Sequence, residues 1–208
     1  MPLSEFITFC SDCFGRIDRY RIADGVISLA IANYPNNDQL NQALTKVILI
    51  NSLYGTSIYD TLRIARHIIT LDCDQKFRDG DISVVDDIRT GHDITLENGN
   101  DRDFYSFATK YASWHSPDHF PIFDNLVKRL LPFLNRDQHF HETFTQVALD
   151  NYDTYKAVID SLMAHCGLEN FGYKRFDQGL WVYAKYKYRG DELPDDILEE
   201  IENAANGV

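Results

Sequence analysis

Apolar residues recur at steps of three and four through most of this 208-residue chain, and sustained alternation of apolar and polar residues is absent. Steps of three and four place side chains on one face of an α-helix, whereas a strand requires a step of two. One such face is traced by Leu40, Leu44, Val47 and Tyr54. The spacing therefore predicts an all-α fold, a compact multi-helix globular domain.

Breakers and caps in the sequence set the expected limits of these helices. Helices are expected over about 3–14 and 18–33, and one that begins at Ser57, where Asp60 follows three residues later as in a capping box. A loop is expected over His92 to Arg102, and the helix after it is expected to end before Pro117. The next helix is expected to kink or end at Pro132, and a further one to begin with Phe140, Phe144 and Val147 and to stop at Gly167.

The domain organisation follows from the absence of repeats and linkers. Residues 1–190 are predicted to form a single helical domain, and residues 191–208 an acidic C-terminal tail or a small appended helix. The tail carries seven acidic residues and no basic one. Because little apolar surface is lost with it, we expect the domain to stay folded when the tail is removed.

The net charge of −12 is unevenly distributed. Beyond the tail, residues 72–103 hold ten acidic and four basic residues, which leaves 16 basic and 15 acidic residues in the remainder. A near-neutral body can present a basic groove, so nucleic acid stays a possible partner. Basic residues gather in three places: Arg16, Arg19 and Arg21; Lys128 and Arg129; and Lys174 and Arg175 with Lys185, Lys187 and Arg189.

No stretch approaches the roughly 20 apolar residues of a membrane span, and the first residues lack a secretory signal, so a cytoplasmic protein with no membrane partner is expected. The four cysteines are then reduced, and Cys10-x-x-Cys13 has no second ligand pair, so they are predicted to be packing thiols. His139, His141 and Glu142 are better explained as loop residues than as metal ligands. We predict neither a metal nor a cofactor, since no phosphate-binding loop or nucleophile elbow is present.

The most distinctive segment runs from Phe107 to Asp124, with the sequence FATKYASWHSPDHFPIFD. On its helix, Lys110 shares a polar face with small hydroxyl residues, and a face so poor in charge is expected to line a cleft or to meet another element. His115 and His119 cannot share a helical face, because Pro117 lies between them.

Lys110, the pattern His-x-Pro-x-x-Phe-Pro-x-x-Asp over 115–124, and Asp-x-x-Leu-Trp over 177–181 together resemble a group of uncharacterised bacterial helical proteins. That group is similar, at a distance, to the helix-hairpin-helix DNA glycosylases. In those enzymes a lysine attacks the sugar carbon of an extruded nucleotide and an aspartate stabilises the developing charge. The resemblance implies cleavage of an N-glycosidic bond in DNA repair or defence, with Lys110 and Asp124 as catalytic residues and Trp114, His115 and His119 in substrate binding.

The alternative is a structural role for the same residues. No glycine lies between Lys110 and Asp124, so the hairpin that holds a DNA phosphate in the glycosylases is missing from this segment. Asp124 is placed to cap a helix, Lys110 to form an ion pair or lie on the surface, and Trp114 to pack. The protein is then a non-catalytic helical interaction or regulatory module, whose acidic tail contacts a basic partner or covers its own basic face.

Overall fold

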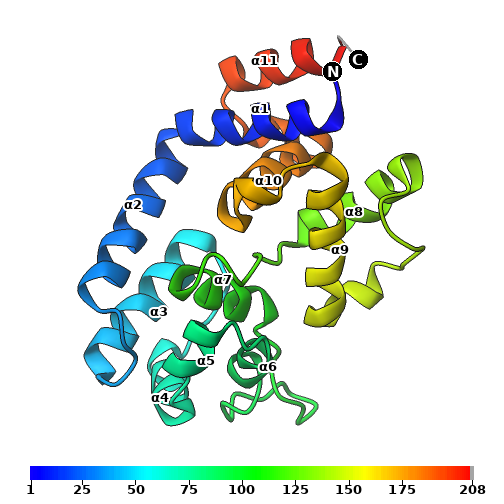
Figure 1. The fold of residues 1–208 in the computed structure, drawn as a ribbon. Helices are drawn as coiled ribbons and strands as arrows, with labels where there is room; N and C mark the ends of the chain where they lie inside the picture. The colour runs from blue at the N-terminus through cyan, green and yellow to red at the C-terminus, as the bar shows by residue number, and fades with distance from the viewer. Residues whose placement is uncertain (207–208) are drawn as a thin grey trace. The chain divides into compact units, whose positions relative to one another are not determined.

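The computed structural model describes residues 1–206 and is helical, as the spacing of apolar residues predicts (Figure 1). Within these residues the only β-type pairing is an isolated bridge between Thr95 and Asp101. The α-helices of the described residues are α1 (Leu3–Arg16), α2 (Asp18–Asn33), α3 (Leu40–Tyr54), α4 (Thr61–Leu71), α5 (Asp74–Asp79), α6 (Ser83–Arg89), α7 (Tyr105–His115), α8 (Asn125–Gln138), α9 (Tyr152–Cys166), α10 (Tyr173–Arg189) and α11 (Asp195–Asn206).

The chain divides into two compact units, which we name for their place in the sequence. The central unit is Ile22–Ile122, and the terminal unit joins Met1–Arg21 to Phe123–Val208. The boundary at the start of the central unit falls inside α2. This division does not coincide with the boundary expected at residue 190, and the organisation into one domain stays a prediction.

In the central unit, α3 packs against α4 and α7, and α6 packs against α4 and α7. The turn between α3 and α4 differs from the expected capping box. Ser57 has a φ of +61° and does not cap the helix, and the N-cap of α4 is Asp60, whose carboxylate accepts the Arg63 N–H at 3.0 Å. The Asn51 side chain holds the turn, because it accepts the Ile58 N–H and donates to the Ile58 carbonyl, both at 2.9 Å.

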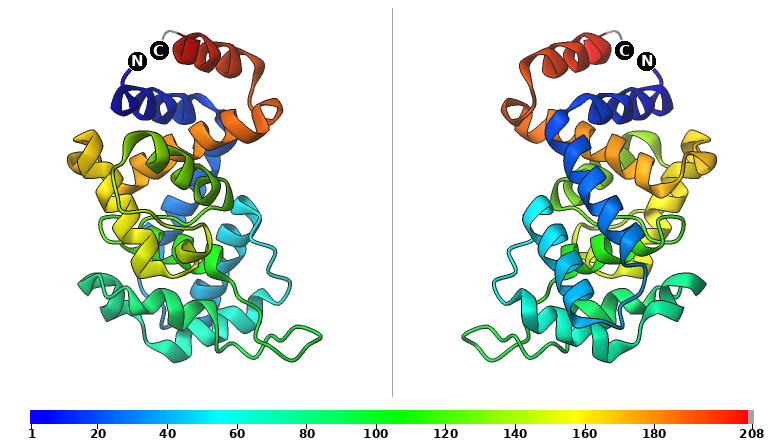
Figure 2. Two further views of the ribbon diagram at one scale, coloured as in Figure 1. Left: turned by 90° about the vertical axis from the view of Figure 1, so that its right-hand side faces the viewer. Right: turned by 90° about the vertical axis from the view of Figure 1, so that its left-hand side faces the viewer.

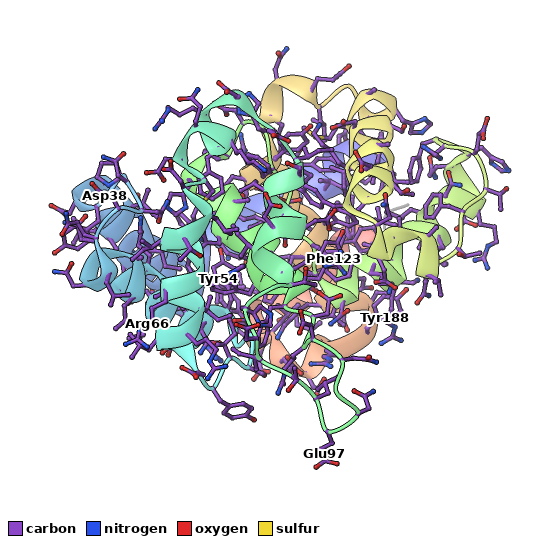
Figure 3. All side chains as sticks on the ribbon, turned by 90° about the horizontal axis from the view of Figure 1, so that it is seen from below. Asp38, Tyr54, Arg66, Glu97, Phe123 and Tyr188 are labelled. Atoms are coloured by element: carbon purple, nitrogen blue, oxygen red, sulfur yellow. The ribbon has the colours of Figure 1, made fainter. Side chains whose placement is uncertain are left out.

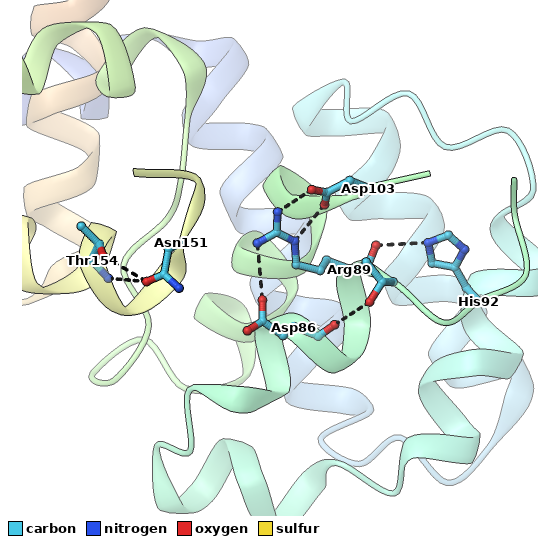
Figure 4. A network of polar contacts seen from close by, with 7 residues as sticks. Asp86, Arg89, His92, Asp103, Asn151 and Thr154 are labelled. Atoms are coloured by element: carbon cyan, nitrogen blue, oxygen red, sulfur yellow. Dashed lines mark hydrogen bonds and ion pairs between the residues drawn. The ribbon is translucent and has the colours of Figure 1, made fainter. Parts of the chain in front are cut away.

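The loop expected over His92 to Arg102 is present and is fastened at its base by Arg89 (Figure 4). The Arg89 guanidinium binds both carboxylate oxygens of Asp103, one of them at 2.9 Å, and lies 3.4 Å from Asp86. Its backbone carbonyl accepts the Phe104 N–H at 3.0 Å. Glu97 lies at the projecting tip of this loop (Figure 3).

In the terminal unit, α10 packs along α1, and α11 lies along the same helix, as the views of Figures 1 and 2 show. These helices enclose an apolar cluster that contains both cysteines of the Cys10-x-x-Cys13 pair. Burial raises the pKa of both thiols, that of Cys13 to about 11, so both stay protonated and pack as apolar groups. From α11 and the turn before it, Leu193, Ile197 and Ile201 complete the cluster.

The burial of these three residues overturns the expectation that the tail adds little apolar surface. Their exposed fractions are 4%, 2% and 0%. The acidic side of the segment also forms ion pairs, since Glu200 binds Arg16 through two contacts of 2.6 Å. The segment from Leu193 to Ile201 is therefore built into the core of the terminal unit.

Two expectations concern α8 and the segment after it. Pro132 was expected to kink or end its helix, and it does not end it, because α8 continues to Gln138. The second expectation is wrong. No helix begins at Phe140: the 3-10 turn η1 (Val147–Asp150) precedes α9, and Val147 is 76% exposed. Instead α9 is capped by Asn151, which accepts the Thr154 N–H at 2.9 Å (Figure 4), and ends at Gly167 as expected.

Helices α1 and α10 approach each other closely at Gly179. A β-carbon at this position would lie 2.5 Å from the Ile7 carbonyl oxygen, a separation at which backbone must move. We expect Gly179→Ala to lower the free energy of unfolding by about 3 kcal/mol, measured by urea denaturation, because one helix must be displaced from the other. Gly15→Ala in α1 is the matched control, since nothing lies within 4 Å of its added carbon. That control should gain up to about 1 kcal/mol from helix propensity, and an equal effect of the two substitutions would contradict the close approach.

Candidate functional site

Helix α7 carries Lys110, Trp114 and His115, three of the five residues predicted to act in the site. Most of its polar face is withdrawn from solvent, because Thr109, Lys110 and Ser113 are all buried and Ser106 is partly buried. Lys110 is 3% exposed, and its ammonium donates to the Ser106 hydroxyl at 2.5 Å. The face therefore meets other parts of the protein, which is one of the two outcomes expected from its low charge.

On one side the Lys110 ammonium lies over an aromatic ring of α3. The distance from its nitrogen to the centroid of the Tyr54 ring is 5.4 Å, within the range of a cation–π contact. Tyr54 is labelled in Figure 3 and lies on the last turn of α3. Lys110 thus has a hydroxyl and a ring as neighbours within the central unit.

His115 belongs to a buried polar network centred on Lys46. The Lys46 ammonium is fully buried and donates three hydrogen bonds: to the Tyr34 carbonyl at 3.0 Å, the Asn36 carbonyl at 2.8 Å and the His115 Nε2 at 3.1 Å. His115 Nδ1 lies 2.8 Å from the Tyr111 carbonyl, which fixes the proton on Nδ1 and leaves Nε2 as acceptor. Every proton of the ammonium therefore has an acceptor.

The electrostatics of this network favour neutral groups. Burial, and then the charge of Lys46, lowers the pKa of His115 to about 3, so its ring is neutral near pH 7. Burial lowers the pKa of Lys46 to about 8. His115 also stacks between two rings, with ring centroids 4.8 Å from Phe77 and 4.5 Å from Tyr111. The ring is thus held by contacts on both faces and at both nitrogens, and its part in substrate binding stays a prediction.

The network continues through Tyr111 to the segment between α2 and α3. The Tyr111 hydroxyl donates to the Asn37 side-chain oxygen at 2.5 Å, and burial raises the pKa of that phenol. Asn37 in turn donates twice to the Asp74 carboxylate, at 2.9 Å from its backbone and 2.6 Å from its side chain. Four separate segments of the central unit are joined by these bonds.

Sequence reasoning missed Lys46 altogether. One signal was available, because Lys46 falls on the same helical face as Ala43, Val47 and Ile50, all fully buried. A lysine in the apolar face of a helix indicates either a buried ion or a long side chain that reaches water. Here the ion is buried.

His119 is exposed in the turn that follows α7, and its Nδ1 lies 2.8 Å from the Ser116 hydroxyl. Its ring rests against Gly80, where an added β-carbon would approach to 2.6 Å. Trp114 is half-buried, and its indole nitrogen is removed from solvent. His115 and His119 thus have different surroundings, one in the polar network and one at the surface.

Asp124 lies in the terminal unit, where it is the N-cap of α8. Its carboxylate accepts the Leu126 N–H at 2.8 Å, the bond that the structural alternative requires. Lys110 lies in the central unit. Joint action of the two residues stays a prediction.

In the part of the chain that the structure describes, no three His, Cys, Asp or Glu side chains are grouped so that they can hold a metal ion. Over the same residues, no helix has the length and apolar character needed to cross a bilayer.

The Asp-x-x-Leu-Trp pattern over 177–181 lies on α10. There Asp177 is buried, and Trp181 packs edge-on against the rings of Phe14 and Tyr20.

Comparison with known proteins gives two matches. The model of a family described as HI_0787_N, N-terminal domain, matches residues 7–119. An uncharacterized protein of Haemophilus influenzae is 32% identical over 147 residues, which cover 70% of this chain and 68% of that relative. No solved structure matches.

Proposed function

The chain belongs to the family described as HI_0787_N, N-terminal domain, and from this premise we propose that it is a non-catalytic helical module that binds another macromolecule. The observation that carries the proposal is the engagement of both candidate catalytic groups in local structure. Lys110 is 3% exposed and donates to Ser106, and Asp124 caps α8. A nucleophile must reach its substrate, and an amine at this depth requires the protein to open first.

A second function, N-glycosidic cleavage of the DNA-glycosylase type, has one observation in its favour. The Lys110 ammonium is withdrawn from water beside the Ser106 hydroxyl, and catalytic lysines that form Schiff bases lie in desolvated sites of this kind. In that function Lys110 attacks the sugar carbon of a nucleotide, Asp124 stabilises the positive charge that develops on the sugar, and nucleic acid is the substrate.

The sign of a stability change separates the two functions. Lys110→Met keeps the apolar stem and removes the ammonium. If Lys110 is structural, the free energy of unfolding falls by about 1–3 kcal/mol, because the Ser106 hydroxyl loses a charged partner. If Lys110 is catalytic, the substitution is neutral or stabilising, since active-site groups are commonly retained at a cost in stability. Urea denaturation measures the difference.

The matched control is Lys76→Met, because Lys76 lies partly exposed in an ion pair of 2.5 Å with Asp87 and should contribute less than about 1 kcal/mol. A second measurement asks directly for chemistry: the full chain is incubated with oligonucleotides that carry damaged bases, and borohydride is added. Base release together with a reduced covalent adduct that Lys110→Gln abolishes would replace the proposed function by the enzymatic one.

A further inference from the structure

Positive charge is concentrated on two packed helices of the terminal unit, in a chain whose net charge is −12. Helix α8 carries three basic residues and one acidic residue, Asp137, and the last two turns of α10, residues 182–189, carry three basic residues and no acidic one. The basic residues are Lys128, Arg129 and Arg136 on α8, and Lys185, Lys187 and Arg189 on α10. Two clusters that lie far apart in the sequence are thereby brought together.

Cations and aromatic rings alternate where these helices meet. The surface formed by Arg129, Phe133, Arg136, Lys187 and Tyr188 is called the basic face below. The Arg129 guanidinium lies 4.2 Å from the centroid of the Tyr188 ring, and the Tyr188 hydroxyl donates to the Arg129 carbonyl at 3.2 Å. The ring of Phe133 lies between two cations, 3.5 Å from the Lys187 ammonium and 5.2 Å from the Arg136 guanidinium. Tyr188 is labelled in Figure 3.

Carboxylates pair with the neighbours of the basic face and with Arg136 at its edge, which lies 3.3 Å from Asp137, but not with Arg129 or Lys187 at its centre. Lys128 is paired with Asp150 at 2.5 Å, and Glu192 binds both Lys185 and Arg189. Within residues 1–206, Arg129 and Lys187 are exposed and form no ion pair. A ring orders a cation without cancelling its charge, so both remain available to an external anion.

We propose that the basic face binds the phosphate backbone of nucleic acid. This inference rests on the proposed function and names the partner of the module. Arg129 and Arg136 lie seven residues apart on α8, about 10 Å along the helix, so neighbouring phosphates of one strand can reach both. Guanidinium groups bind phosphate in a bidentate manner, and a surface that alternates cations with rings is typical of proteins that bind single strands.

A membrane fits this surface less well. A helix that lies in a bilayer interface inserts an apolar side, but Phe133 and Tyr188 are half-buried beneath the cations of the basic face. Phosphate contact without insertion is therefore the interaction that the geometry favours.

The test is fluorescence anisotropy of the full chain with a fluorescein-labelled oligonucleotide of about 20 nucleotides, as a single strand and as a duplex, between about 50 and 200 mM salt. The unmodified protein is expected to bind at the lower salt and to weaken steeply as salt rises. Arg129→Gln with Lys187→Gln should weaken binding by about tenfold or more, and should reduce the slope of log K against log salt by about 1.4 for the single strand. Arg136→Gln alone should weaken binding less.

A matched control separates the basic face from net charge. Arg19→Gln with Arg66→Gln removes two positive charges from exposed arginines elsewhere that form no ion pair in the described residues, and should leave binding within about twofold. Equal weakening by both pairs of substitutions overturns the inference, as does the absence of binding by the unmodified protein at low salt. The inference is also overturned if Arg129→Gln with Lys187→Gln loses affinity for phosphatidylserine vesicles while its affinity for the oligonucleotide is unchanged.

The inference and the proposed function can fail separately. Circular dichroism confirms that each variant is folded, which is expected for substitutions on the surface. If the oligonucleotide binds through the basic face and a base is also released, the non-catalytic function is wrong and the binding face stands. If the face variant binds like the unmodified protein, the binding face is wrong whatever the catalytic result.

Discussion

Truncation after Gly190 is expected to unfold the terminal unit, or to leave it with less than about half of its stability. The lost segment contributes Leu193, Ile197 and Ile201, all buried in the cluster with Phe6 and Val182. Full burial of one such side chain stabilises a protein by about 1.5–3 kcal/mol, so the three together contribute about 5–9 kcal/mol, a large part of the stability of an ordinary domain. Loss of this burial also exposes the apolar side of α1.

Tryptophan fluorescence makes the measurement specific to this unit, because Trp181 lies in the terminal unit and Trp114 in the central one. In a Trp114→Phe background, urea denaturation followed by fluorescence reports on the surroundings of Trp181. Ile201→Ala should lose about 2–4 kcal/mol on its own. Glu202→Ala, at an exposed position on the same helix, should change stability by less than about 0.5 kcal/mol. A truncated chain as stable as the full one would show that the packing of α11 contributes nothing.

Lys46→Met is expected to cost about 3–5 kcal/mol, the largest effect of any single charge removal in the central unit. Methionine fills the space of the lysine stem but donates no hydrogen bond, so the carbonyls of Tyr34 and Asn36 and the Nε2 of His115, all in part-buried contacts, lose their donor. Urea denaturation at pH 7 measures the loss. Lys76→Met, with its partly exposed ion pair, again serves as the control.

The pH dependence of stability is the second measurement on this network. The folded-state pKa of His115 is about 3, below its ordinary 6.5, so the unfolded chain binds the proton first as the pH falls. Stability present above pH 6.5 is therefore lost between pH 6.5 and 3. Lys46→Met removes a charge that lowers this pKa, so the loss of stability on acidification should be smaller in the variant. An unchanged acid profile in the variant would contradict the contact between Lys46 and His115.

The pKa of Lys46 in the folded protein is about 8, below its ordinary 10.5, so the unfolded chain binds more protons between these values. Stability therefore rises with pH between 8 and 10.5, the opposite of the effect of a lysine paired with a carboxylate.

Spacing of apolar residues was sufficient for the all-α fold and for a helix with one continuous apolar face, such as α3. It failed at Phe140, where Phe140, Phe144 and Val147 repeat at helical steps in an irregular segment. The reason lies in Asn135, whose side chain accepts the His141 N–H at 2.9 Å and donates to the Glu142 carbonyl at 3.2 Å. Because a side chain of the preceding helix forms hydrogen bonds with these backbone groups, the segment is stable without the hydrogen bonds of a helix.

The candidate site was less accessible to sequence reasoning, because its contacts join distant segments. The cap at Asp124 is local and can be inferred from one position before a helix. His115 is different: its partner Lys46 lies 69 residues earlier in the chain, and no spacing rule connects them. The motif around Lys110 indicated an unusual helix. Whether its polar face is exposed to solvent or buried depends on contacts with other segments, which the sequence alone does not show.

The order in which the two units become complete during synthesis follows from the path of the chain. The central unit is one uninterrupted segment and can acquire its fold as soon as residue 122 has left the ribosome. Helix α1 precedes α10 and α11, its partners in the terminal unit, so the side that bears Phe6 and Cys10 stays uncovered until they are made. The region matched by the family model, residues 7–119, takes in most of α1 without either partner, so a fragment cut to those limits should be more prone to aggregation than one that begins at Ile22.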